Sequence, residues 1–227
     1  ISKRKFGGNK INFIHTFTCK FLAVVLLSLI NSCGYKNEKN TQYFCTKLNL
    51  NCETDNNLVV FYTSKGTIKI QLFADSHPVT VANFLSKVKR NIYTNKNFYK
   101  IITYANNKII HNGLNEIDDY GQMNTKDIDN FDSIPLEIKL FNKDPIYQNP
   151  ILNPMEIKKI RHKFEKGSLS MVKINKNRSS STEFFFIINN SPELDGRYSI
   201  FGKVISGLAI LDNIDKKDYI KKIEIAY

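Results

Sequence analysis

Residues 182–204, TEFFFIINNSPELDGRYSIFGKV, constrain the fold of this 227-residue chain more than any other stretch. They begin with an apolar run that places Phe184, Phe186 and Ile188 on one side and Phe185 and Ile187 on the other. Successive side chains of a strand point to opposite faces, so a strand with one solvated face is apolar only at alternate positions. Other parts of the protein must therefore pack against both faces of this strand, or Phe185 is left accessible to a ligand. Simple core filling is the alternative for Phe185.

Short apolar runs separated by Gly and Asn turns continue from residue 58 to the end of the chain, a pattern typical of an antiparallel barrel or sandwich. The first two runs predict a hairpin with its turn at residues 64–66. A helix is predicted from Pro78 onward, because apolar residues then recur at helical spacing. A second short helix is predicted over residues 207–216, before a closing strand.

The amino terminus has the features of an export signal. Residues 1–32 contain five Lys or Arg and no acidic residue, and they include the ten-residue apolar run FLAVVLLSLI. That run is too short for a spanning helix, which needs about 20 apolar residues. The following INSC resembles a bacterial lipobox with Cys33 as the lipidated residue; a cleaved signal or a short anchor with an incidental cysteine are the alternatives. We predict a lipoprotein-like signal peptide over 1–32, a polar tether over 33–57 and a folded domain over 58–227, anchored to a membrane of the cell envelope.

Two cysteines besides Cys33 lie in the predicted tether. Cys45 and Cys52 are close in sequence, and an exported compartment permits a disulfide between them. Zinc is the weaker interpretation, because no Cys or His pair stands nearby at ligand spacing. Two unpaired thiols remain an alternative.

The net charge of +12 does not indicate a nucleic-acid-binding protein. Lysines are spread along the whole chain, and no Lys/Arg block is interleaved with aromatic residues as in single-strand binders. We therefore expect no nucleic-acid partner.

From residue 58 onward, the order of segments resembles bacterial cyclophilin-type peptidyl-prolyl cis-trans isomerases. GTIKIQLFADSHPVTVANFLSKV resembles their opening strands and first helix, and NFYKII resembles their catalytic strand. KGSLSMVKINKNRSSSTEFFFII resembles their groove wall, and PELDGRYSIFGKVISGLAILDNI resembles the loop, strand and helix that follow. The resemblance implies a mainly β fold, a closed eight-stranded antiparallel barrel with two capping helices and a substrate groove on its outer surface.

The resemblance also implies which residues form the groove. Phe184 and Phe186 are expected to fill the barrel, while Phe185 forms the floor of an outer pocket for a proline ring. The full set of implied substrate-binding residues is Phe98, Ile109, Met171, Val172, Glu183, Phe185, Leu194 and Tyr198.

Isomerisation of an X–Pro bond needs a site that binds the twisted amide better than either planar form, so we expect no cofactor and no metal. The resemblance implies two catalytic residues. Lys100 stands where the family has an Arg, in FYK rather than FHR, and His111 stands at the groove glutamine of the QGG motif. Lys100 keeps the positive charge but lacks the planar fork of donors. Loss of one charge-assisted hydrogen bond predicts a rate about tenfold to a hundredfold lower. A merely solvated Lys100 is the alternative.

Two functions follow from the resemblance. The first is a peptidyl-prolyl cis-trans isomerase of reduced efficiency that assists the folding of exported proteins. The second is a non-catalytic cyclophilin-like module that binds proline-containing segments of envelope proteins. In both, the partners are proline-containing polypeptides and, through Cys33, a membrane surface. We expect a monomer. His162 is interpreted as a structural residue.

Overall fold

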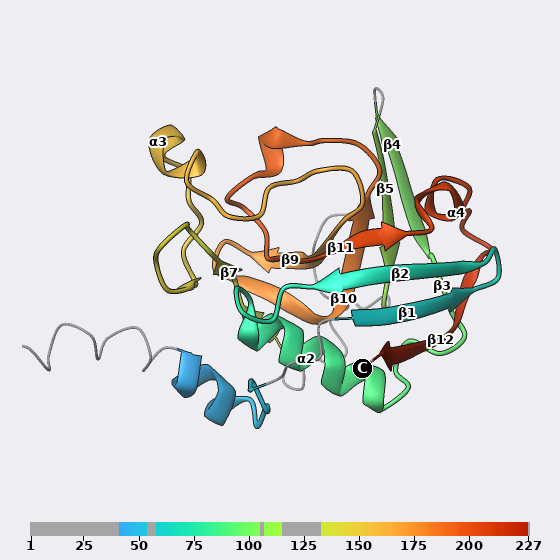
Figure 1. Ribbon diagram of the computed structural model, residues 1–227, viewed down its shortest axis with the longest axis horizontal. Coiled ribbons are helices and arrows are strands. Elements are labelled where there is room, and N and C mark those ends of the chain that lie inside the picture. Colours follow the sequence, from blue (N-terminus) through green and yellow to red (C-terminus); the bar gives the residue numbers. More distant parts are fainter. Residues whose placement is uncertain (1–40, 54–57, 105–106, 115–132, 227) are drawn as a thin grey trace, which may run out of the picture. The chain divides into compact units, whose positions relative to one another are not determined.

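The computed structural model describes residues 41–53, 58–104, 107–114 and 133–226. Within this part of the chain, ten strands form one antiparallel sheet that curls on itself (Figure 1). The strands are β1 (Leu58–Thr63), β2 (Thr67–Leu72), β3 (Lys96–Asn97), β4 (Lys100–Tyr104), β5 (Asn107–Asn112), β6 (Ser133–Pro135), β9 (Ser168–Asn175), β10 (Arg178–Ile187), β11 (Ile200–Ser206) and β12 (Tyr219–Ala226). Their order is β3-β12-β1-β2-β11-β9-β10-β5-β4, and β6 pairs with β10.

The two ends of this order are joined by the chain itself. β3 pairs with β12 and β4 pairs with β5, but only Phe98 and Tyr99 separate β3 from β4. At this junction the Phe98 N–H donates to the carbonyl of Asp218, at 2.9 Å. When β3 and β4 count as one kinked strand and the three-residue β6 is set aside, the sheet has the eight strands that the resemblance implies. The mainly β antiparallel fold is therefore confirmed.

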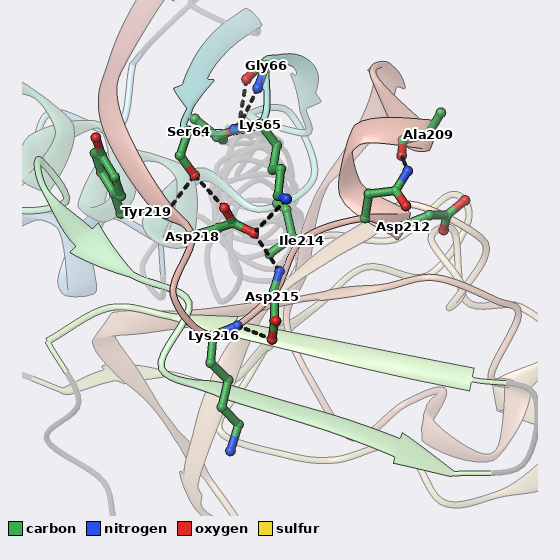
Figure 2. A network of polar contacts seen from close by, with 12 residues as sticks. Ser64, Lys65, Gly66, Ala209, Asp212, Ile214, Asp215, Lys216, Asp218 and Tyr219 are labelled. Carbon is green, nitrogen blue, oxygen red and sulfur yellow. Dashed lines mark hydrogen bonds and ion pairs between the residues drawn. The ribbon is translucent and has the colours of Figure 1, made fainter.

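A polar network surrounds Asp218, whose carbonyl accepts from Phe98 at the β3–β4 junction (Figure 2). Its carboxylate accepts hydrogen bonds from the Ser64 hydroxyl and the Asp215 N–H, both at 2.8 Å, and lies 3.8 Å from the Lys65 ammonium. Burial raises the pKa of Asp218, but these hydrogen bonds and the positive charge of Lys65 lower it more, so the net pKa lies below the ordinary value. The network connects the β1–β2 turn to the segment that leads into β12.

Two helices cover the sheet as predicted. α2 (Pro78–Lys89) begins with a proline at its first turn and buries Val81, Phe84 and Leu85 in the main core. α4 (Leu208–Asp212) contributes Leu211 to the same core. The structure adds the short helix α3 (Pro154–Ile157), the 3-10 turn η2 (Pro192–Leu194) and the small strand pair β7 (Glu137–Ile138) and β8 (Ile146–Tyr147). None of the helices in the described ranges combines the length and hydropathy that crossing a bilayer requires.

The polar tether predicted over 33–57 is corrected for residues 41–53. Residues 41–47 are helical, and Phe44 packs against Tyr147 with ring centroids 5.1 Å apart. The Thr41 and Tyr147 hydroxyls are hydrogen-bonded at 2.7 Å. The predicted Cys45–Cys52 disulfide is confirmed. The segment is polar in composition, but one of its faces, with Phe44 and Cys45, is buried. The predicted signal peptide and Cys33 lie outside the described residues.

Candidate active site

The two faces of β10 lead into two separate apolar clusters. Phe184 and Phe186 lie in the main core, where both rings contact Phe61 edge-on. Phe185 and Ile187 lie on the opposite face of the strand, in a second cluster that we call the outer cluster. Its buried members are Phe164, Phe185, Ile187 and Ile200, and its partly buried members are Phe73, Ile109, Val172, Leu194 and Tyr198. The alternation of the sequence thus predicts the faces correctly, and Phe185 keeps only 3% of its surface exposed because other side chains surround it.

Lys100, His111 and Phe185 form a row across three neighbouring strands. Lys100 of β4 is the register partner of His111 in β5, and His111 is the partner of Phe185 in β10. Directly paired residues point to the same face of a sheet, so all three side chains belong to the outer face. The His111 and Phe185 rings are stacked, with centroids 5.5 Å apart. Both predicted catalytic residues therefore lie beside the outer cluster.

His111 is uncharged at neutral pH. Burial and, secondarily, the positive charge of Lys100 lower the pKa of His111 to about 4. A neutral imidazole offers one N–H donor and one acceptor nitrogen. At this position it can donate a hydrogen bond to a carbonyl group without adding a second cation beside Lys100.

Phe164 and Tyr198 cover the Phe185 ring from two sides. Phe164 is stacked on Phe185 with a centroid distance of 5.9 Å, and Tyr198 meets it edge-on at 5.5 Å. The Phe164 N–H donates to Asp195 Oδ1 at 2.8 Å, so the loop that carries Tyr198 also positions Phe164. Gly196 is required in this loop: its φ is +75°, and a Cβ there would lie 2.2 Å from the Ile151 carbonyl oxygen. Phe164 is not among the predicted site residues, because no local pattern in the sequence connects it to a loop thirty residues later.

The exposed edge of the outer cluster carries both signs of charge. The Tyr104 hydroxyl donates to the Glu193 carboxylate at 3.0 Å. The Lys173 ammonium lies over the Tyr198 ring, 5.9 Å from its centroid. Ile109, Val172, Leu194 and Tyr198 are each partly exposed along this edge. They are the predicted substrate-binding residues that a ligand can reach, and Lys100 and His111 are partly exposed as well.

Three predicted substrate-binding residues are corrected. Phe98 and Met171 are fully buried in the main core, and Met171 is there because it pairs with the inward-facing Phe184. Glu183 is also fully buried, and its carboxylate accepts a hydrogen bond from the Tyr99 hydroxyl. Phe98 and Met171 support the strands from inside. Glu183 lies beside the row, because its partner Tyr99 also contacts the His111 ring, but its side chain is covered.

His162 contacts Phe73 rather than the Lys100–His111–Phe185 row. Its ring is stacked on Phe73 at 3.8 Å, and its Nε2 lies 3.1 Å from the Ser76 hydroxyl. The described residues contain no group of three or more His, Cys, Asp or Glu placed to hold a metal ion. The chemistry that the site can offer from the described residues is an ammonium group, a neutral imidazole and an apolar surface.

Comparison with known proteins identifies one family. The family model described as cyclophilin type peptidyl-prolyl cis-trans isomerase/CLD matches residues 58–225. A peptidyl-prolyl cis-trans isomerase of Helicobacter pylori is 28% identical over 163 residues, covering 71% of this chain and 82% of the relative. One from Acinetobacter baylyi is 26% identical, covering 70% and 72%. Among solved structures, a Cryptosporidium parvum cyclophilin type isomerase in the presence of the dipeptide Ala-Pro has a TM-score of 0.51 at 24% identity, covering 75% of this chain and 99% of that one.

Proposed function

The chain belongs to the cyclophilin-type peptidyl-prolyl cis-trans isomerase family, and from this membership we propose that it accelerates cis-trans exchange of X–Pro bonds in exported polypeptides. The observation that carries the proposal is the row of Lys100, His111 and Phe185 on the outer face. The names of the bacterial relatives support the same reaction.

The proposed mechanism is preferential binding of the twisted amide. Rotation about the X–Pro bond removes amide resonance and leaves a lone pair on the prolyl nitrogen. The proline ring packs against the partly exposed edge of the outer cluster, above Phe185. From the same face, the Lys100 ammonium donates to the prolyl nitrogen as it becomes pyramidal, and neutral His111 donates to a substrate carbonyl. Interactions that are stronger in the twisted state than in the planar states lower the barrier.

The proposed efficiency is lower than that of family members with an arginine. A lysine supplies a single, strongly hydrated point charge, whereas a guanidinium presents a planar fork of donors. The difference of one charge-assisted hydrogen bond is expected to reduce kcat/KM by about tenfold to a hundredfold.

The proposed location is the cell envelope, with lipidated Cys33 as the membrane anchor. The basic, acid-free segment before the apolar run supports export. The Cys45–Cys52 disulfide supports an oxidising compartment, because structural disulfides are rare where thiols are kept reduced. Labelled fatty acid is expected to be incorporated into the protein in a bacterial host and to be lost in Cys33→Ala. Absence of label in the unaltered chain would contradict the anchor.

Isomerase activity is tested with proline peptides and the full chain. Exchange spectroscopy by NMR measures cis-trans interconversion directly, and the rate is expected to exceed the uncatalysed rate. Lys100→Ala and Phe185→Ala are expected to lower it, whereas Lys69→Gln, which alters an exposed lysine of β2, is not. Circular dichroism establishes that each variant is folded. Binding of the peptides without any acceleration would replace the isomerase with a binding module.

A further inference from the structure

One cationic side chain contacts the outer cluster, and two more lie near that side chain. The Lys173 ammonium lies over the Tyr198 ring, and Tyr198 in turn contacts Phe185 edge-on. Arg197 precedes Tyr198 in the same loop, and Lys176 follows Lys173 in the β9–β10 turn. Burial lowers the pKa of Lys173, and the positive charges of Arg197 and Lys176 lower it further, so both of these cations are close enough to repel Lys173.

These cations are not neutralised by acids of the described chain. Exposed lysines elsewhere form ion pairs, such as Lys166 with Asp212 and Lys203 with Glu165. None of the ion pairs found between described residues involves Lys173, Lys176 or Arg197.

Three acidic residues that adjoin members of the outer cluster in sequence or in space already accept hydrogen bonds. Glu193 accepts from the Tyr104 hydroxyl, and Asp195 accepts from the buried Phe164 N–H. Glu183 is fully buried and accepts from the Tyr99 hydroxyl. Lys100 adds positive charge on the other side of Phe185, beyond His111. Lys100 and Lys173 therefore place positive charge on both sides of Phe185, and Glu193 places one negative charge, hydrogen-bonded to Tyr104, at the same edge.

We propose that this site selects polypeptides in which an acidic residue lies directly before or after the proline. The proposal rests on the proposed function, because it uses the same outer cluster as the proline-binding surface. A carboxylate beside the proline would pair with Lys173 and Arg197, for which the described residues supply no ion-pair partner. Because these cations are largely solvated, one such pair is expected to favour the acidic peptide by about twofold to fivefold, and salt is expected to weaken the preference.

The test uses four peptides with the full chain: Ala-Glu-Pro-Ala, Ala-Gln-Pro-Ala, Ala-Ala-Pro-Glu and Ala-Ala-Pro-Gln, with blocked ends. Glutamine matches glutamate in shape and lacks its charge. Binding is measured by NMR titration, and the catalysed exchange rate is divided by the uncatalysed rate of the same peptide. At low salt, one glutamate peptide or both are expected to exceed the glutamine counterpart by about twofold to fivefold. The ratio is expected to approach one at about 0.5 M salt.

Matched variants connect the preference to these residues. The double substitution Lys173→Gln and Arg197→Gln is expected to bring the Glu/Gln ratio towards one, whereas Lys69→Gln leaves the ratio unchanged. Equal binding of the glutamate and glutamine peptides at low salt would overturn the selectivity while leaving the isomerase in place. A preference that survives both the double substitution and high salt would also overturn it. Selective binding without acceleration would support the preference and contradict the isomerase, and failure of all four peptides to bind would overturn both.

Discussion

The imidazole of His111 is stacked on the ring of Phe185, with centroids 5.5 Å apart and planes inclined by 27°. Lys100 pairs with His111 from the opposite side, in β4. His111 therefore lies between the Lys100 side chain and the outer cluster that contains Phe185. Because these side chains are in contact, the effects of substituting them are not expected to be additive.

The position of His111 predicts how activity depends on pH. Burial and the charge of Lys100 lower the pKa of His111 to about 4, so the ring is neutral throughout the range from about pH 6 to 8. The exchange rate is expected to be constant over that range and to fall as the pH approaches about 4, where the ring gains a charge next to Lys100. His111→Gln is expected to lack this acid limb. A decline centred near the ordinary histidine pKa of about 6.5 would contradict the assignment.

Lys100 predicts a gain of function. Lys100→Arg restores a guanidinium that can direct more than one N–H towards the prolyl nitrogen and the neighbouring carbonyl, so kcat/KM is expected to rise by about tenfold. Lys100→Met keeps much of the apolar stem and removes the charge, and the rate is expected to fall towards the uncatalysed value. Equal rates for the lysine, arginine and methionine proteins would mean that this position takes no part in the reaction.

The fold was predictable because strand alternation and the resemblance agreed. The same alternation that separates Phe185 from Phe184 also places Met171 inward, since Val172 faces outward in β9. The resemblance, applied residue by residue, misplaced Met171 and Phe98, because similarity of sequence does not state which face a side chain occupies. Phe164 was not predictable, since its position depends on the hydrogen bond from its N–H to Asp195 across the fold.

The disulfide predicts how much the amino-terminal segment contributes to stability. Cys45 and Cys52 close a loop with a sequence separation of 7 residues. Closing so short a loop reduces the conformational entropy of the unfolded chain and raises its free energy by about 2–3 kcal/mol. The double substitution Cys45→Ser and Cys52→Ser is therefore expected to lower the free energy of unfolding by that amount. Urea unfolding measures it, and a thiol reductant should have the same effect on the unaltered chain and none on the double variant. Unchanged stability would mean that residues 41–53 unfold independently of the sheet.

Truncation tests that segment separately from the disulfide. A chain that begins at Thr41 keeps the Phe44–Tyr147 contact and the Thr41–Tyr147 hydrogen bond, whereas a chain that begins at Leu58 loses both. The shorter chain is expected to be less stable by about 2–4 kcal/mol, mainly through lost apolar burial. Thermal unfolding of the two proteins compares them directly. Equal midpoints would restore the interpretation of residues 41–53 as a tether.

His162 predicts a loss of stability in acid. Burial lowers the pKa of His162 to about 4, below the unfolded value of about 6.5. Between these two pH values the unfolded chain binds more protons at His162 than the folded chain does. The stability that neutral His162 contributes is therefore complete above about pH 6.5 and is lost as the pH falls towards about 4. His162→Gln is expected to reduce the slope of unfolding free energy against pH in that interval. Lys69→Gln provides the surface control.

Glu137 is expected to give unfolding free energy the opposite dependence on pH. Its fully buried carboxylate accepts hydrogen bonds from the Thr80 N–H at 2.8 Å and the Thr80 hydroxyl at 2.6 Å, at the start of α2. Burial nevertheless raises the pKa of Glu137 to about 7, above the ordinary value of 4.5. The folded chain therefore binds the extra proton between these values, and ionisation of Glu137 lowers stability as the pH rises through that interval, by about 3 kcal/mol in all.

Glu137→Gln is expected to remove that decline. The rise in unfolding free energy that His162 causes is then unopposed, so from about pH 4.5 to 7 the variant's unfolding free energy rises more steeply than that of the unaltered chain. The absolute stability at pH 5 is expected to be lower by about 1–2 kcal/mol, since the amide group of glutamine cannot accept from every donor that Glu137 satisfies. Urea unfolding at stepped pH values measures both effects. His162→Gln should make the dependence of unfolding free energy on pH less steep. If the Glu137→Gln variant and the unaltered chain instead gave parallel curves of unfolding free energy against pH, Glu137 would be ionised in the folded protein, with its charge stabilised by the start of α2.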